Sequence, residues 1–231
     1  MTSPVTVGLL HPGQMGAAVG HELTKAGVLV LWCPAGRSDA SSRRAEEAGL
    51  DAVPELDSLL EHSSVVISLC PPAAAEETAD AVREAGFSGI FIEANAISPH
   101  RAERIAADMA AHGARTVDGC VIGPPPRGLV ATRLYLSGVE AELAAVVDLF
   151  AGTAVVPIQM EGAVGAASAL KMAYGSYQKA ACALAGVAQA LGRAHGVDEH
   201  LTAEARRLAR GDFASRSTEA PCSKFPSSVT P

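Results

Sequence analysis

The residues of this chain with the clearest potential for chemistry lie in a short loop near its start. The apolar run 5–10 is followed by a glycine-containing turn and then by a helical pattern over residues 14–25. Strand, tight loop and helix in this order open a dinucleotide-binding unit, and the loop occupies the positions of a G-x-G-x-x-G fingerprint with His11 at the first glycine. An ordinary strand-turn-helix is the alternative interpretation.

Each part of this loop has a role in binding a pyrophosphate. Gly13 would let the backbone approach the phosphates, and Gly16 would let the helix pack closely on the strand. The helix N-terminus offers unpaired N–H groups and the positive end of its dipole. We therefore expect the cofactor to bind at His11, Pro12, Gly13, Gln14, Met15 and Gly16.

The region after the second apolar run, 28–32, indicates which dinucleotide would bind. NAD-binding proteins usually carry an acidic residue here, which accepts a hydrogen bond from the ribose 2′-OH. This chain has Arg37 and Ser38 instead, with no carboxylate before Asp39. Since a guanidinium pairs well with phosphate oxygens, Arg37 and Ser38 predict a 2′-phosphate and hence NADP (NADPH). The alternative is that this arginine, like Arg43 and Arg44, is a solvated surface charge.

Two more polar segments follow apolar runs. Cys70 and Pro71 come after the run 65–69, and Asn95 comes after the run 89–93. Ligands of open α/β sheets bind outside the carboxyl ends of the strands. We therefore expect these residues beside the nicotinamide, with Asn95 hydrogen-bonded to its carboxamide or to a substrate. Ser98 is the expected N-cap of the next helix.

Lys171 lies in a long apolar segment of helix-forming residues. Burial would lower the pKa of its amine and suit it to proton transfer. Alternatively, its stem covers apolar surface while its head reaches water. Tyr174 and Gln178 follow at helical spacing and are expected on the same face.

The elements that must position these residues alternate along the chain, which predicts an α/β fold with a Rossmann-type, mostly parallel sheet. Strands are expected at 5–10, 28–32, 52–53, 65–69, 89–93, 116–117, 133–137 and 154–157, and a loop over 119–128. Helices are expected at 14–25, 40–48, 55–62, 74–85, 99–112 and 141–151.

A small all-α region with one long helix is expected after the sheet. Residues 163–194 are nearly apolar on all sides, which predicts burial in a core or a subunit interface. A short helix is expected at 203–208. The predicted organisation is an NADP-binding domain at 1–160, a helical substrate and dimerisation region at 161–210, and a disordered tail at 211–231.

Composition narrows the function classes. The net charge of −7 and the absence of a basic cluster argue against nucleic acid and against an amphipathic membrane-surface helix. No apolar run is long enough to span a membrane, and no signal peptide is recognisable. Five scattered cysteines without a C-x-x-C pair predict no metal site, reduced thiols and a cytoplasmic location. The expected partners are a small-molecule substrate and, through the long helix, a second copy in a homodimer.

Over residues 4–210 the chain resembles the β-hydroxyacid dehydrogenase superfamily, which includes 6-phosphogluconate dehydrogenase, 3-hydroxyisobutyrate dehydrogenase and imine reductases. Residues 8–16 are similar to the family's G-x-I-G-L-G-x-M-G opening, and 95–99 to its S-T-x-x-P segment. Residues 118–124 are similar to its substrate loop D-A-P-V-S-G-G. Residues 165–175 are similar to its catalytic-helix signature G-x-G-x-x-x-K-x-x-x-N, centred on Lys171.

The resemblance implies an NADPH-dependent oxidoreductase that transfers hydride between nicotinamide and a small carbonyl or hydroxy compound, with Lys171 as acid/base. Substrate contacts are implied for Asp118, Ile122, Gly123, Tyr174, Gly175 and Gln178. Ile122 stands where the family has serine and Gly175 where it has asparagine, so a typical short hydroxy acid is not the expected substrate. The segment ALKMAYGSYQKA is closer to a 6-phosphogluconate-dehydrogenase-like branch.

Two alternatives remain open at this point. An imine reductase would use Tyr174 as proton donor. The family's C-terminal helical domain continues beyond the point where this chain becomes rich in Ser and Pro, so a truncated form is expected. A cofactor-binding protein without catalysis is therefore the other alternative.

Overall fold

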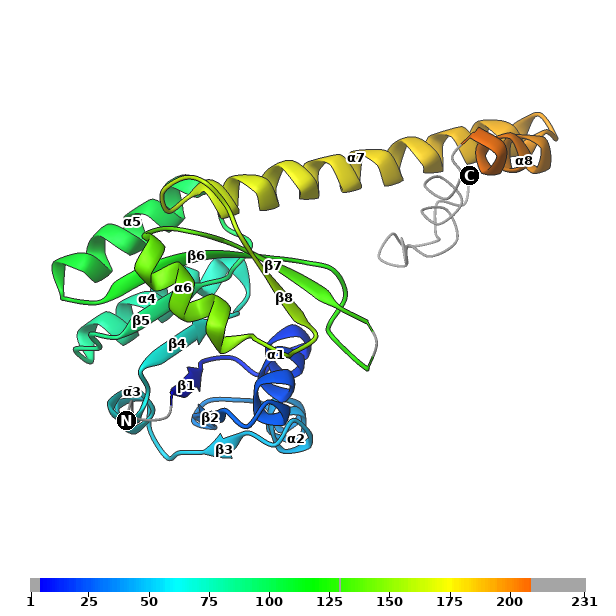
Figure 1. The fold of residues 1–231 in the computed structure, drawn as a ribbon. Helices are drawn as coiled ribbons and strands as arrows, with labels where there is room; N and C mark the ends of the chain where they lie inside the picture. The colour runs from blue at the N-terminus through cyan, green and yellow to red at the C-terminus, as the bar shows by residue number, and fades with distance from the viewer. Residues whose placement is uncertain (1–4, 129, 209–231) are drawn as a thin grey trace. The chain divides into compact units, whose positions relative to one another are not determined.

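The structure, a computed structural model, describes residues 5–128 and 130–208 (Figure 1). Its strands are β1 (Thr6–Leu9), β2 (Leu29–Trp32), β3 (Asp51–Ala52), β4 (Val65–Ser68), β5 (Ile90–Glu93), β6 (Arg115–Ile122), β7 (Thr132–Ser137) and β8 (Val155–Gln159). Its helices are α1 (Gln14–Lys25), α2 (Asp39–Glu47), α3 (Leu56–His62), η1 (Pro72–Ala74), α4 (Ala75–Glu84), α5 (Pro99–Ala111), α6 (Glu140–Leu149), α7 (Ala166–Ala194) and α8 (Asp198–Leu208).

The described strands form one sheet in the order β3-β2-β1-β4-β5-β6-β7-β8. All neighbouring pairs are parallel except β6 and β7, which are antiparallel. The predicted fold class, a mostly parallel Rossmann-type sheet followed by a long helix, is confirmed. β1 lies between β2 and β4, so the winding direction reverses there, and ligands of such sheets bind outside the carboxyl ends at this reversal.

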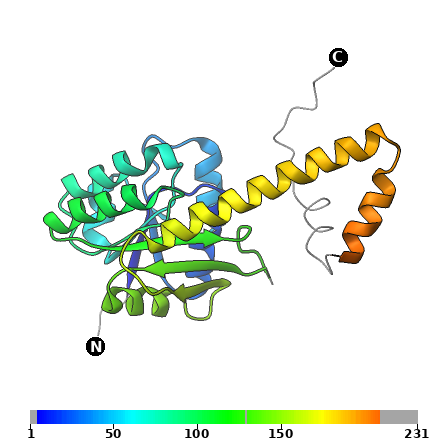
Figure 2. The ribbon, with the colours of Figure 1, turned by 90° about the horizontal axis from the view of Figure 1, so that it is seen from above.

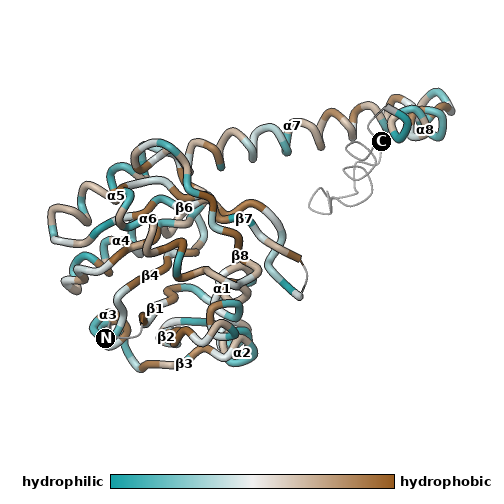
Figure 3. The backbone as a smooth tube through the Cα atoms, viewed as in Figure 1, coloured by the Kyte–Doolittle hydropathy of each residue, from teal (hydrophilic) through white to brown (hydrophobic). Residues whose placement is uncertain are grey.

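Alternation of apolar residues builds a core on both faces of the sheet. In β4, Val65 and Ile67 belong to one hydrophobic cluster, whereas Val66 belongs to the other. The first cluster packs beneath α1, α2 and α6, and the second beneath α3, α4 and α5. Figure 2 shows α4 and α5 on one side of the sheet and α6 on the other. The strands are largely brown, the hydrophobic end of the scale, in Figure 3, as expected for a doubly covered sheet.

β6 is longer than the sequence pattern indicated. A strand was expected only at 116–117 with a loop from residue 119, but β6 continues to Ile122, so that expectation is wrong. Antiparallel pairing with β7 extends it, with Gly119 opposite Leu136 and Ile122 opposite Arg133. A Cβ at Gly119 would lie 3.3 Å from the Cβ of Ala94, so the missing side chain allows close approach of neighbouring strands.

α8 begins at Asp198, five residues before the expected 203–208 helix, because polar residues form its first turn. The expected tail at 211–231 lies outside the described residues. Within the described residues, no helix is both long enough and apolar enough to cross a membrane.

A row of polar side chains crosses the sheet at one register. Ser68, Glu93, Asp118 and Ser137 pair successively across β4, β5, β6 and β7, and all are completely buried. Backbone N–H groups and a serine hydroxyl at the start of α7 donate hydrogen bonds to this row.

Asp118 is the main attachment point of α7. Its Oδ2 accepts hydrogen bonds from the backbone N–H groups of Gly165 and Ser168, both at 2.9 Å, and its Oδ1 accepts one from the Ser168 hydroxyl at 2.7 Å. The Ser137 hydroxyl donates to Asp118 Oδ2 at 3.2 Å and accepts from the N–H of Ala167 at 3.0 Å. A carboxylate at a helix N-terminus is favoured by the helix dipole and satisfies N–H groups that have no partner within the helix.

The described residues form two compact units, 5–172 and 173–208. The part of α7 in the second unit carries exposed apolar side chains, among them Leu184, Val187 and Leu191, which are 70%, 67% and 62% exposed. Of the two kinds of burial expected for this helix, a core of its own chain does not enclose these three side chains. Burial in a subunit interface stays a prediction.

Replacing Asp118 with Asn should weaken the attachment of α7. The amide NH₂ would face N–H donors and leave buried donors unpaired, so we expect the free energy of unfolding to fall by about 1–3 kcal/mol. Asp108→Asn, an exposed position on α5, is the matched control and should change it by less than about 0.5 kcal/mol. Denaturant unfolding measures both; equal stability of the two variants would contradict the role of Asp118.

Candidate functional site

The glycine loop between β1 and α1 is shaped to accept an anion. Gly13 is the N-cap of α1, no side chain caps the helix, and its first turn contains no acidic residue. The first-turn N–H groups therefore lack acceptors within the helix, and the positive end of its dipole is not neutralised by a nearby carboxylate. These features fit the pyrophosphate of a dinucleotide.

The two glycines of the loop differ in their surroundings. A Cβ on Gly16 would lie 2.2 Å from the carbonyl oxygen of His11, so only glycine allows the loop to fold back on the helix here. A Cβ on Gly13 would have no atom within 4 Å, so this side of the loop is open. This division agrees with the packing expected from the fingerprint, while cofactor binding by residues 11–16 stays a prediction.

His11 brings a neutral ring to the loop. Burial, together with the smaller effect of the Arg37 charge, lowers the pKa of His11 to about 4. Its Nδ1 is buried and has no hydrogen-bond partner among the described residues. The loops after β1 and β2 are therefore close enough to interact electrostatically, and the positive charge there comes from Arg37 rather than from His11.

The predicted 2′-phosphate residues follow β2. Arg37 is exposed, and Ser38 is the N-cap of α2, where its hydroxyl accepts the N–H of Ser41 at 3.3 Å. Arg44, half-buried on α2, donates from Nε to the carbonyl of Pro12 at 3.1 Å. The carboxyl ends of β1 and β2 thus carry the glycine loop, the capped start of α2 and the guanidinium groups of Arg37 and Arg44.

Asn95 joins the ends of β4 and β5. Its Oδ1 accepts from the N–H of Cys70 at 2.6 Å, and its Nδ2 donates to the Ser68 hydroxyl at 2.8 Å. Both amide atoms of this buried residue thus have partners in the protein, and contact with nicotinamide or substrate stays a prediction. Burial raises the pKa of the Cys70 thiol, which accepts from Thr78.

The segment after β5 also opens α5. Ser98 is the N-cap residue and Pro99 the first helical residue, as the sequence indicated, but the Ser98 side chain makes no capping hydrogen bond.

Glu93 is a site residue that the sequence analysis did not single out, although an acidic residue at the end of an apolar strand is an available signal. It is fully buried, its Oε1 accepts from the N–H of Asn95 at 3.0 Å, and its Oε2 has no partner among the described residues. The pKa of Glu93 is raised to about 7: burial is the largest cause, the charges of Asp118 and Glu76 act in the same direction, and the Asn95 hydrogen bonds oppose the shift. Glu93 therefore titrates near neutral pH, and it is hydrogen-bonded to the residue that joins β4 and β5.

Lys171 reaches the extended end of β6. It is half-buried, and its Nζ donates to the carbonyl oxygen of Val121 at 2.5 Å. The neighbouring Cys120 has its pKa raised to about 11 by burial, against the effect of the Lys171 charge, so this thiol stays protonated. A primary amine is thus fixed at the strand end that follows Asp118.

The other predicted substrate residues have diverse surroundings. Ile122 is buried in β6, and Gly123 begins the next loop with φ +133°, a conformation that favours glycine. Tyr174, Gly175 and Gln178 lie in the second unit, where Gln178 Nε2 donates to the Tyr174 hydroxyl at 2.7 Å. The groups that donate to Asp118 all belong to the protein. A contact with substrate stays a prediction for Asp118 and for the other five residues predicted to contact it.

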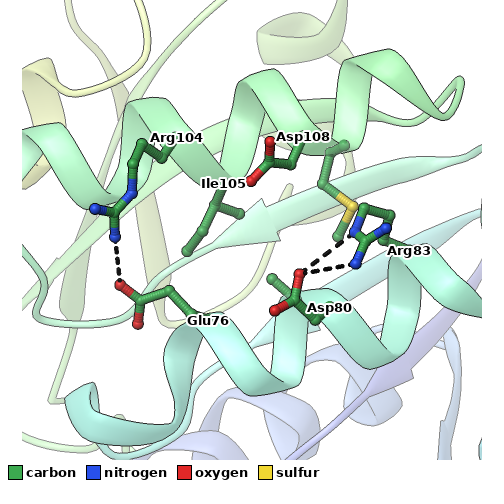
Figure 4. A pocket seen from close by; sticks show the side chains of 8 residues that line it. Glu76, Asp80, Arg83, Arg104, Ile105 and Asp108 are labelled. Carbon is green, nitrogen blue, oxygen red and sulfur yellow. Dashed lines mark hydrogen bonds and ion pairs between the residues drawn. The ribbon is translucent and has the colours of Figure 1, made fainter.

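A cavity of about 160 Å³ lies between α4 and α5 (Figure 4). Four of its charged lining residues form ion pairs with one another, Arg104 with Glu76 at 3.2 Å and Arg83 with Asp80 at 3.1 Å. Glu76 also binds Arg101, which lowers the pKa of Glu76 to about 2. The cavity contains none of the predicted site residues.

The described residues hold no His, Cys, Asp and Glu cluster suited to a metal ion.

The comparisons with known proteins show the family of this chain. The sequence pattern of the NAD-binding domain of 6-phosphogluconate dehydrogenase matches residues 6–164, and the chain belongs to this family of nicotinamide-dependent oxidoreductases. It is 27% identical over 179 residues to an uncharacterised 28.5 kDa protein of Methanothermus fervidus. The aligned region covers 77% of this chain and 67% of that protein.

Solved structures show the same fold. A conserved protein of unknown function, reported as similar to 3-hydroxyacid dehydrogenases, is 25% identical with a TM-score of 0.74, over 94% of this chain and 83% of the other. Mycobacterium tuberculosis 3-hydroxyisobutyrate dehydrogenase with L-serine is 22% identical with a TM-score of 0.74, over 92% and 73%. An imine reductase variant of Myxococcus stipitatus with NAD+ is 20% identical with a TM-score of 0.70, over 91% and 74%.

Glu93→Gln should remove a pH dependence of stability. The pKa of Glu93 is raised from 4.5 to about 7 on folding. The contribution of its protonation to the free energy of unfolding is therefore fully present below pH 4.5 and is lost as the pH rises through about 7. The unfolding free energy of the wild type minus that of Glu93→Gln should therefore decrease between these pH values. Taking the difference cancels the titration of His11. A difference that is constant with pH, measured by denaturant unfolding, would contradict the burial of an ionisable carboxyl here.

Proposed function

We propose that this protein is an NADPH-dependent oxidoreductase of the β-hydroxyacid dehydrogenase type, acting on a small carbonyl or hydroxy compound. The observation that carries the proposal is the combination of an open glycine loop at the start of α1 with an amine fixed at the end of β6. The first group suits a dinucleotide pyrophosphate and the second suits proton transfer.

The residues of this chain would divide the work as follows. The N-terminus of α1 holds the pyrophosphate, and Arg37 with Ser38 holds the 2′-phosphate, because guanidinium and hydroxyl groups both donate to phosphate oxygens. When bound, the nicotinamide would supply the hydride for reduction of the substrate carbon, or accept it in oxidation. Lys171 gives a proton to the substrate oxygen in reduction and takes it back in oxidation, while the Val121 carbonyl orients its amine.

The substrate proposed is not a typical short hydroxy acid. Ile122 cannot donate a hydrogen bond through its side chain, and Gly175 has no side chain, so these two positions offer no polar side-chain group to a carboxylate. An imine substrate, with Tyr174 as donor, is the second candidate, because Gln178 orients the Tyr174 hydroxyl through a 2.7 Å hydrogen bond. We further propose a cytoplasmic location, small-molecule substrates only, and no nucleic acid or membrane as partner.

We also propose a homodimer formed through α7. The exposed Leu184, Val187 and Leu191 support it, because helices with contiguous exposed apolar side chains generally pack against a partner. Sedimentation equilibrium tests it; a monomer at micromolar concentration would reject the proposal.

Cofactor titration followed by a substrate panel tests the proposed function. Calorimetry should give tight binding of NADPH and weaker binding of NADH, because the loop after β2 carries Arg37 instead of an acidic residue. The panel contains aldehydes, ketones, alcohols and cyclic imines, with NADPH oxidation or NADP+ reduction followed by absorbance. Binding without turnover on any of them would support a cofactor-binding protein without catalysis, and binding of neither cofactor would reject both.

Lys171→Met should lower kcat by about 100-fold or more without preventing NADPH binding, because it removes the acid/base but keeps the length of the side chain. Lys179→Met is the matched control: this lysine is exposed on the same helix and should leave kcat unchanged. Retained turnover in Lys171→Met would exclude the amine as the proton donor and would favour Tyr174.

A further inference from the structure

Two adjacent arginines of α2 have different surroundings. Arg43 is exposed, whereas Arg44 is half-buried and forms two hydrogen bonds. Its Nε donates to the carbonyl oxygen of Pro12 at 3.1 Å, and its NH2 nitrogen donates to the hydroxyl of Ser41 at 3.0 Å. Arg44 is therefore held in place, while its neighbour is a solvated charge.

The two hydrogen bonds of Arg44 join two loops that are distant in sequence. Pro12 belongs to the glycine loop that precedes α1. Ser41 lies in the first turn of α2, and its hydroxyl is 3.2 Å from that of Ser38, the N-cap. The connection Pro12–Arg44–Ser41–Ser38 thus links the proposed pyrophosphate loop with the proposed 2′-phosphate residues.

The charge of Arg44 is not neutralised locally. Both of its acceptors are neutral oxygens, and no carboxylate within the described part of the chain forms an ion pair with it. A guanidinium presents its N–H groups in a planar fork that matches phosphate oxygens, and these two bonds leave some of those N–H groups unused. Such a group, held between two anion-binding loops, suits a phosphate.

We infer that Arg44 positions both loops and selects NADPH over NADH, an inference that rests on the proposed function. Its bond to Pro12 fixes a loop that both cofactors would use. Its charge, and its bond to Ser41, act at the end of the site where only NADPH carries a phosphate. Arg44 therefore has a larger effect on NADPH than on NADH.

The test compares dissociation constants of NADPH and NADH for the wild type, Arg44→Gln and Arg43→Gln. A bond from a charged donor to a phosphate is strong, so Arg44→Gln should weaken NADPH binding about tenfold or more. NADH binding should weaken by less, about two- to threefold, through the loop alone. Arg43→Gln, with the same change of charge one residue earlier, should leave the ratio of the two constants unchanged.

Arg44→Lys and Ser41→Ala complete the experiment. Lysine keeps the charge but cannot form both hydrogen bonds, so it should recover part of the NADPH affinity. Ser41→Ala removes one partner of Arg44 and should weaken NADPH binding several-fold with NADH unchanged; it carries the test if Arg44→Gln does not fold, which thermal unfolding reveals.

The outcomes separate this inference from the proposed function. If Arg44→Gln and Ser41→Ala bind NADPH as tightly as the wild type, the inference about Arg44 is overturned and the proposed function stands. Equal losses for NADPH and NADH would overturn its role in selection. Failure of the wild type to bind either cofactor would overturn the proposed function and this inference with it.

Discussion

The carboxylate of Asp118 is the interaction on which the geometry of the candidate site depends. It accepts hydrogen bonds from two backbone N–H groups and a hydroxyl at the start of α7, and from the Ser137 hydroxyl on β7. A helix attached at its N-terminus in this way has its first turns fixed in position and rotation. Lys171 lies one turn beyond Ser168, and its amine consequently reaches the Val121 carbonyl of the same strand that carries Asp118.

The same buried row contains two carboxyl groups on neighbouring strands, and they differ in the hydrogen bonds that they accept. Asp118 accepts hydrogen bonds from four donors, two backbone N–H groups and two hydroxyls. Glu93 has a single backbone donor and an unpaired oxygen, so burial favours its neutral form and its pKa is about 7. Two adjacent buried charges would repel each other strongly in a poorly solvated interior. Glu93, with fewer donors, is the carboxyl group of the row whose pKa is raised, and it lies next to Asn95.

The cofactor end of the site depends on contact between loops. Gly16 lets the chain fold back against the His11 carbonyl, Arg44 fastens the glycine loop to α2, and Arg37 helps to keep His11 neutral. Backbone N–H groups at the start of α1 and guanidinium groups near α2 are therefore the sources of positive character at this edge. Such an arrangement suits a ligand with two separate phosphate groups.

The sequence by itself determined the order of strands and helices, the mostly parallel sheet and the glycine loop, because local periodicity and glycine geometry depend on neighbours along the chain. It indicated Lys171 as an unusual residue in an apolar helix. Only the tertiary structure decided that β6 extends to Ile122, that Asp118 binds the start of α7, that Glu93 is enclosed and titrates near neutrality, and that Arg44 is anchored whereas Arg43 is exposed. Each of these properties arises from hydrogen bonds, pairing or burial between residues far apart in the chain, and residue type and spacing do not report such contacts.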